Sequence, residues 1–127
     1  MVSYAATTQG ITIAVRPVYL DGESDSLVGR LTFAYFVRIE NDGLGEVQLL
    51  RRHWIITDAT GKRTEVEGEG VVGQQPVLAP GDVYEYQSFC VLETFVGSME
   101  GTYLMQRENG ERFRAQIPRF HLAARAN

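Results

Sequence analysis

Apolar and polar residues alternate along most of this 127-residue chain. The longest series has a large apolar group at every second position, at Leu31, Phe33, Tyr35, Val37 and Ile39. Polar residues such as Thr32 and Arg38 occupy intervening positions. Because successive side chains of a strand point to opposite faces, this pattern predicts a strand over residues 31–39 with one buried face.

The same alternation, bounded by Gly, Pro, Asn and Asp residues, predicts six more strands. They span residues 11–16, 46–58, 63–67, 83–91, 97–107 and 111–117. Pro17 and Pro118 are expected to limit the first and the last of these strands, since proline has no N–H to donate. Asn109-Gly110 and Ala79-Pro80-Gly81-Asp82 are strong signals for tight turns.

Strands joined by tight turns run antiparallel, and strands with a single apolar face need a second sheet to cover it. The sequence therefore predicts one all-β domain over residues 1–127. We expect an antiparallel β-sandwich of about seven strands, of the immunoglobulin or fibronectin type III kind. In strand 46–58, Leu50, Trp54 and Ile56 are expected on the buried face. Strand 63–67 alternates charged residues, as an edge strand protected from pairing with other chains does.

The formal net charge is −4 at pH 7, which argues against a dedicated nucleic-acid binder. The C-terminal end is mildly basic, and Arg112, Arg114 and Arg119 are candidate protein contacts there. Cys90 is the only cysteine, so no intrachain disulfide can form, as expected in a reducing compartment. The first eight residues have no signal-peptide pattern, and no apolar run approaches the roughly 20 residues of a membrane span. We expect a cytoplasmic protein.

Gly68, Gly70 and Gly73 form a G-x-G-x-x-G motif. Such a loop binds pyrophosphate when a strand precedes it and a helix follows it. A helix is not expected here because Pro76 and Pro80 lie just beyond the motif. The favoured interpretation is a glycine-rich crossing between strands, where positive φ or close backbone approach is required.

Other candidate sites have weaker signals. Asp21, Glu23 and Asp25 alternate as in a calcium-binding loop, but the required glycine and the bidentate glutamate are absent at their positions. This leaves a weak divalent-cation site as an alternative. His53, His121 and Cys90 do not have zinc-ligand spacing, and no nucleophile motif is present. We therefore expect no enzyme, no resident metal and no cofactor.

Several segments resemble the bacterial ApaG family. They are GEGVVGQQPVLAP at residues 68–80, GSMEGTYLM at residues 97–105, IPRFHL at residues 117–122 and the region through His53-Trp54. The resemblance covers nearly the whole chain and implies a fibronectin type III-like sandwich. The family is associated by name with cobalt and magnesium resistance. A similar domain in F-box proteins and in a DNA polymerase delta-interacting protein implies protein binding.

Two hypotheses follow from the sequence. The leading one is a non-catalytic module that presents an edge strand or loops to a protein partner, with residues 68–75 and the three C-terminal arginines as candidate contacts. The alternative is a sensor that binds a pyrophosphate or nucleotide through Gly68, Gly70 and Gly73, or a weak divalent-cation binder.

Overall fold

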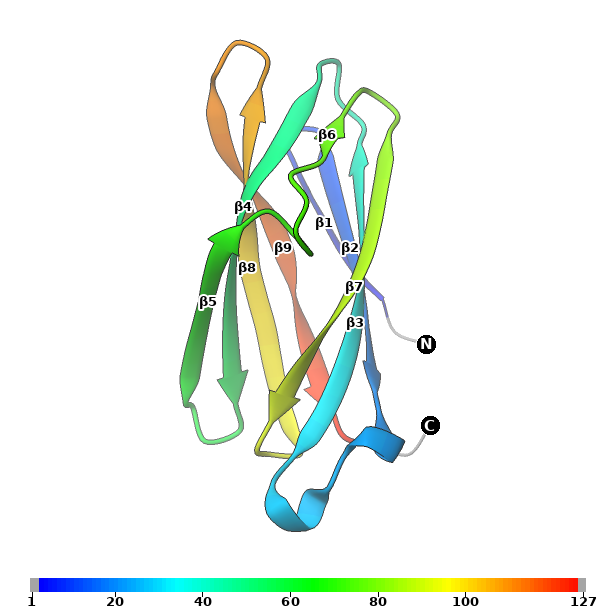
Figure 1. Ribbon diagram of the computed structural model, residues 1–127, viewed down its shortest axis with the longest axis vertical. Coiled ribbons are helices and arrows are strands. Elements are labelled where there is room, and N and C mark those ends of the chain that lie inside the picture. Colours follow the sequence, from blue (N-terminus) through cyan, green and yellow to red (C-terminus); the bar gives the residue numbers. More distant parts are fainter. Residues whose placement is uncertain (1–2, 126–127) are drawn as a thin grey trace.

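The alternating apolar residues meet in a core between two antiparallel sheets (Figure 1). The computed structural model describes residues 3–125. The first two and last two residues of the predicted domain lie outside the described residues. Within the described part, nine strands form the sandwich, which confirms the predicted fold class. No helix within residues 3–125 is long and apolar enough to cross a membrane.

Four strands form the first sheet. In spatial order they are β1 (Tyr4–Thr8), β2 (Ile11–Tyr19), β3 (Leu31–Asn41) and β7 (Val83–Leu92). Two short 3₁₀ turns, η1 (Asp21–Glu23) and η2 (Ser26–Val28), connect β2 to β3.

The second sheet has the order β5 (Arg63–Glu69), β4 (Val47–Asp58), β8 (Val96–Arg107) and β9 (Arg112–Ala123). The two-residue strand β6 (Val77–Leu78) pairs with the start of β4.

Trp54 of β4 lies at the centre of the core with 3% of its surface exposed. Its ring packs against Tyr35 of β3, Tyr103 of β8 and Phe120 of β9, with centroids 5.2 to 6.2 Å away. All five alternating apolar residues of β3 are also buried. The prediction of a core tryptophan between two sheets is therefore confirmed.

Both prolines expected to limit strands lie inside strands instead. Pro17 is paired with Tyr35 of β3, but β1 pairs with β2 only as far as Val15. On its β1 side Pro17 therefore has no neighbouring strand that would need its missing N–H. Pro118 lies where β9 has one more residue than β8, between the pairs Met99–Phe120 and Gly101–Ile117. Such a bulge tolerates the missing hydrogen bond, and the strand continues to Ala123.

Strand β4 also contains an irregularity that the alternation did not predict. Its register shifts between Leu49 and Arg51, so Leu49 is fully buried while Leu50 is only partly buried. The expectation that Leu50 shares the buried face with Trp54 is therefore wrong. Beyond the shift, Arg52 lies on the same face as Trp54 and points between the sheets.

The two sides of the sandwich differ. On one side β9 lies against β1 and β2. On the other side both sheets end, the first at β7 and the second at β5 (Figure 1). The charged strand β5 is thus an edge strand, as predicted. Residues 70–76 fold between β4 and the upper half of β7.

Candidate interaction site

The G-x-G-x-x-G motif forms the end of β5 and a tight hairpin. Val71 and Gln74 exchange two backbone hydrogen bonds of 2.8 and 2.9 Å across Val72-Gly73. Both turn residues have positive φ, 47° at Val72 and 76° at Gly73, as a type I′ turn requires. The hairpin places Val71 completely in the core. The motif therefore forms a hairpin that covers the core at the edge of the sandwich. This agrees with the favoured interpretation, a glycine-rich crossing between strands.

The first two glycines serve close packing. A Cβ on Gly70, whose φ is 62°, would overlap the carbonyl oxygen of Gln74. A Cβ on Gly68 would lie 2.8 Å from the Arg52 guanidinium. This guanidinium donates hydrogen bonds of 3.0 Å to the carbonyl oxygens of Glu69 and Gly70. Arg52 thus clamps the hairpin to β4 through the space that Gly68 leaves.

The backbone of this loop is largely engaged in its own fold. The N–H of Gly70 donates to the carbonyl oxygen of Leu50. The N–H of Val71 donates to the carbonyl oxygen of Gln74, and the N–H of Gln74 donates to that of Val71. A pyrophosphate site needs such N–H groups free and a following helix, whereas β6 follows here. Anion binding by the motif stays a prediction that the geometry does not support.

Arg52 acts electrostatically on three tyrosines, the buried Tyr35 and Tyr103 and the partly buried Tyr86. The hydroxyl groups of Tyr86 and Tyr103 hydrogen bond to each other between the two sheets. Burial raises the pKa of both phenols, and it raises the pKa of Tyr35 as well. All three hydroxyls therefore stay protonated at neutral pH and act as packing and hydrogen-bonding groups.

Cys90 is a buried residue of β7. Burial raises the pKa of its thiol from 9.0 to about 12, so the reactive thiolate does not form at neutral pH. His53 lies on the outer face of β4, 2.9 Å from a carboxylate oxygen of Glu65. His121 lies on β9, with its ring 6.5 Å from that of Tyr4. The structure does not bring the thiol and either imidazole together.

The three predicted contact arginines share one face. Arg112, Arg114 and Arg119 project from β9 on the outer side of the second sheet, and each reaches a polar group on β8. Arg119 is also 3.7 Å from a carboxylate oxygen of Glu100. The three arginines form an exposed row, and side chains of β8 already accept some of their guanidinium hydrogen bonds.

The acidic segment after β2 forms turns. Asp21 and Glu23 belong to η1, and the carboxylate of Asp25 accepts the N–H of Leu27 at 3.1 Å. Across the described residues, no group of three or more His, Cys, Asp or Glu side chains is arranged to hold a metal ion. Divalent-cation binding at Asp21, Glu23 and Asp25 stays an untested alternative.

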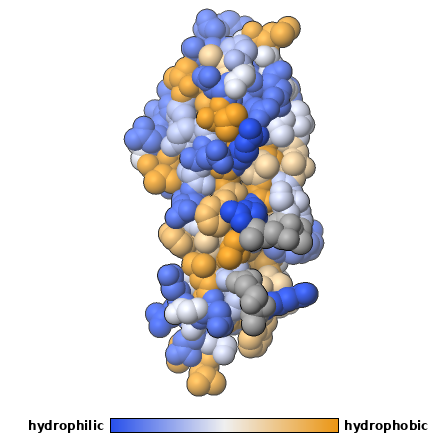
Figure 2. Space-filling view, turned by 90° about the vertical axis from the view of Figure 1, so that its right-hand side faces the viewer, coloured by the Kyte–Doolittle hydropathy of each residue, from blue (hydrophilic) through white to orange (hydrophobic). Residues whose placement is uncertain are grey.

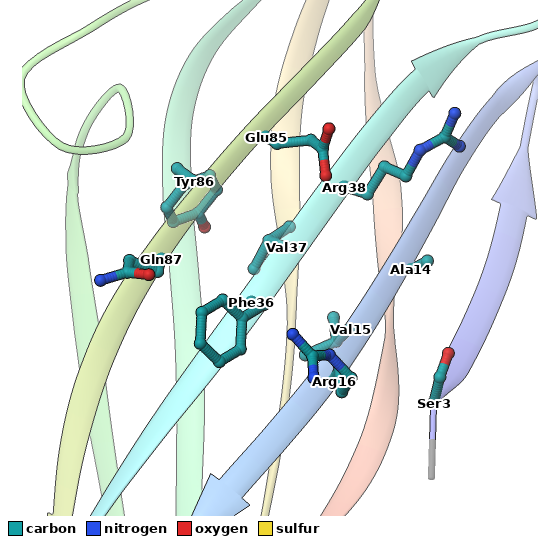
Figure 3. Close-up of a pocket in the computed structure, with 10 residues that line it drawn as sticks. All are labelled: Ser3, Ala14, Val15, Arg16, Phe36, Val37, Arg38, Glu85, Tyr86 and Gln87. Atoms are coloured by element: carbon teal, nitrogen blue, oxygen red, sulfur yellow. The ribbon is translucent and has the colours of Figure 1, made fainter. Parts of the chain in front are cut away.

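A hollow of about 460 Å³ lies on the outer face of the first sheet (Figure 3). Arg16 of β2 lies over the ring of Phe36 at 4.6 Å, and Arg38 lies 2.6 Å from Glu40. Glu85 of β7 pairs with Arg38 in the strand register, and its side chain lies beside that of Arg38 (Figure 3). The charged residues that line the hollow are Arg16, Arg38 and Glu85, and Arg38 is paired with Glu40, which lies outside the lining.

The same side of the molecule carries apolar side chains along its middle, flanked by polar ones (Figure 2). Phe89 and Val91 lie on the outer face of β7, with 56% and 54% of their surface exposed. Phe95 and Val96, just after the end of β7, are exposed too. Among the described residues, β7 pairs only with β3 and leaves its other edge open.

Sequence reasoning did not identify Arg52 or the β7 edge. The alternation that puts Trp54 and Ile56 on one face also puts Arg52 there, and this signal could have found the clamp. The segment Gln87–Leu92 contains no charge and no proline. That composition is unusual for an open edge, but the sequence did not show that β7 lies at the edge of its sheet.

Comparison with known proteins agrees with this structure. The ApaG domain matches residues 21–107. Protein ApaG of Paramagnetospirillum magneticum is 53% identical over 94% of this chain and 92% of its own length. Protein ApaG of Anaeromyxobacter dehalogenans is 52% identical over 92% of each chain.

A crystal structure of a Bordetella pertussis protein named ApaA is also similar. It superimposes with a TM-score of 0.87 at 49% identity, over 89% of this chain and 92% of its own. Outside residues 21–107 lie β1 and β2, which belong to the first sheet, and β9, which belongs to the second. On the matched domain and on identities near 50% over most of its length, this chain belongs to the ApaG family.

Proposed function

We propose that this protein is a non-catalytic interaction module whose protein partner binds on the β7 side of the sandwich. The observation that carries the proposal is the open edge of β7 beside exposed apolar side chains. Open edges of soluble proteins are normally protected by charges, prolines or bulges. Strand β5 has such protection in Glu65 and Glu67, whereas the last six residues of β7 have none.

The exposed apolar residues support the same site. Phe89 and Val91 follow each other on the outer face of β7, and Phe95 and Val96, which come soon after β7 in the chain, are exposed as well. Contiguous exposed apolar groups mark contact surfaces more often than isolated ones do. Aromatic residues in particular are enriched in protein interfaces.

Nothing in the chemistry of the described groups favours catalysis over binding. The buried thiol and phenols are protonated at neutral pH. The imidazole of His53 is directed to Glu65 instead of to a nucleophile. The row of Arg112, Arg114 and Arg119 and the loop of residues 68–75 are secondary candidate contacts, because hydrogen bonds within the chain already occupy much of both.

The experiment compares co-purification after crosslinking in the native host for three proteins: the wild type, Val91→Lys and Leu44→Lys. Leu44 is a fully exposed apolar residue in the β3–β4 loop, so its substitution matches the change in charge and hydropathy. We expect a specific partner to be lost with Val91→Lys and kept with Leu44→Lys. Equal recovery from all three proteins would place the contact elsewhere.

A further inference from the structure

The two sheets do not cover each other completely at the β7 side. In β5, Thr64 and Val66 pair with Ile56 and Trp54 of β4, so their side chains point to the inner face of the second sheet. The first sheet ends at β7 and provides no strand opposite β5. As a result Val66 is 39% exposed, although its neighbour Trp54 is buried. Arg52 covers Gly68 on the inner face of β5, whereas no strand of the first sheet lies over Val66 and Thr64.

The chain itself fills the upper part of this space. The hairpin of residues 70–76 lies between β4 and β7, with Val71 in the core (Figure 1). Below the hairpin the space continues between β5 and the lower half of β7. A groove of about 90 Å³ opens there. Its lining residues are Ile56, Asp58, Lys62, Thr64, Val91, Leu92 and Glu93.

The edge of β7 beside this groove can accept a further strand. Its ten residues pair with β3 in one continuous register without a bulge. The stretch Gln87–Leu92 is uncharged, so it presents regular backbone donors and acceptors with no electrostatic obstacle. Strand addition to such an edge is a recurring mode of peptide recognition.

We propose that an extended segment of a partner protein adds to β7 at Gln87–Leu92, as a fifth strand of the first sheet opposite β5. This inference rests on the proposed function and specifies how the partner binds. Side chains on one face of the added strand cover Val66, Thr64 and Ile56. Those on the other face extend the row of Phe89 and Val91.

The geometry also specifies the chemistry of the segment. The groove has room for a small aliphatic group, so Val, Thr or Ala fit at the inward positions. β-branched residues are favoured in strands, and proline is excluded because the backbone must pair. The partner segment is therefore an extended, proline-free stretch with small β-branched residues at every second position.

A second copy of this chain fits the groove less well. In a β7–β7 pair, Tyr86, Ser88 and Cys90 of each copy point into that copy's own core and cannot fill the groove of the other. Pairing along a single strand also buries less than the roughly 800 Å² per partner of a standard stable interface. A separate segment can fill both the edge and the groove.

The test uses the full chain and a probe peptide, Ac-Gln-Thr-Val-Thr-Val-Thr-Val-Gln-NH₂. Backbone amide shifts and methyl shifts are recorded by NMR as the peptide is added to millimolar concentration. We expect shifts at Gln87–Leu92, at Val66 and at Ile56, with slowed amide exchange along β7. Two control peptides keep the side chains, one with N-methyl groups at its valines and one with N-methyl groups at its threonines. Successive N–H groups of a strand point to opposite sides, so one of the two controls loses the donors that face β7. That control should bind at least about tenfold more weakly, because its backbone cannot pair with β7.

Val91→Lys should weaken binding of the probe. The matched control is Val83→Lys, on the same face of β7 but outside Gln87–Leu92, and it should leave binding unchanged. Absence of shifts, binding of both N-methylated peptides as tight as that of the probe, or shifts confined to Phe36 and Arg16 would overturn strand addition. So would a dimer of the free protein with β7 amides protected. If crosslinking in the host still finds a partner that Val91→Lys loses, the proposed function stands and only strand addition fails.

Discussion

The structural role of the G-x-G-x-x-G motif predicts an unequal response to alanine at its three glycines. Gly70→Ala combines three costs. At φ 62° a residue with a Cβ lowers the free energy of unfolding by about 1–2 kcal/mol relative to glycine. The Cβ must displace the Gln74 carbonyl, whose 2.8 Å hydrogen bond from the Val71 N–H contributes about 1 kcal/mol. The displaced hairpin also withdraws Val71 from the core, and full burial of a valine contributes about 1.5–3 kcal/mol.

Together these terms lower the free energy of unfolding by about 3–5 kcal/mol for Gly70→Ala when Val71 is partly displaced. Gly73→Ala meets open space at φ 76°, so only the backbone term of about 1–2 kcal/mol applies. Gly68→Ala pushes the end of the flexible Arg52 side chain. Its cost is the loss of two hydrogen bonds from a charged donor, about 1–3 kcal/mol in partly exposed surroundings.

Urea unfolding followed by circular dichroism measures all three variants under identical conditions. The predicted order of destabilisation places Gly70→Ala well above the other two. Equal losses at Gly70 and Gly73, or a Gly70→Ala variant within about 1 kcal/mol of the wild type, would refute the reasoning from close packing.

Further predictions concern the anion site and the buried groups. Pyrophosphate or ATP at millimolar concentration should not shift the NMR amide signals of Gly70 and its neighbours; saturable shifts there would restore the anion hypothesis. Tyr86→Phe leaves the buried Tyr103 hydroxyl without its partner and should cost about 1–2 kcal/mol by urea unfolding, part of which returns in the double variant with Tyr103→Phe. Burial raises the pKa of Cys90 from 9.0 to about 12, so the unfolded thiol ionises first and stability falls as pH rises above 9. Between pH 8 and 10.5 this loss is about 2 kcal/mol, and Cys90→Val should remove it; an unchanged pH dependence would contradict the burial argument.

Alternation predicted the sandwich because burial of one strand face leaves a period of two in the sequence. It worked best for β3, where five large apolar residues have no interruption. It was wrong at Pro118 and at Leu50, where bulges shift the register. A bulge depends on the pairing of two strands distant in sequence, so the sequence of one strand does not reveal it. The strand β1 escaped prediction because its Tyr4–Thr8 segment is short and rich in small residues.

The candidate site was less predictable than the fold. The glycines of residues 68–73 were recognised as a crossing, but their partner Arg52 becomes visible only when β4 and β5 are paired. Similarly, the uncharged residues of β7 are ordinary for a central strand and become significant only at an edge. Sheet order is a property of the tertiary fold, and the order here leaves β7 open while β5 is charged.

Binding of a protein partner along the open edge of β7 can be tested by photo-crosslinking from position 89. The experiment uses p-benzoylphenylalanine in place of Phe89 in the native host and the same substitution at Leu44 as the matched control. We expect a discrete covalent adduct from position 89 that is absent from position 44, and a crosslinked peptide from an extended, proline-free segment. The same adducts from both positions, or none from position 89, would contradict binding along this edge.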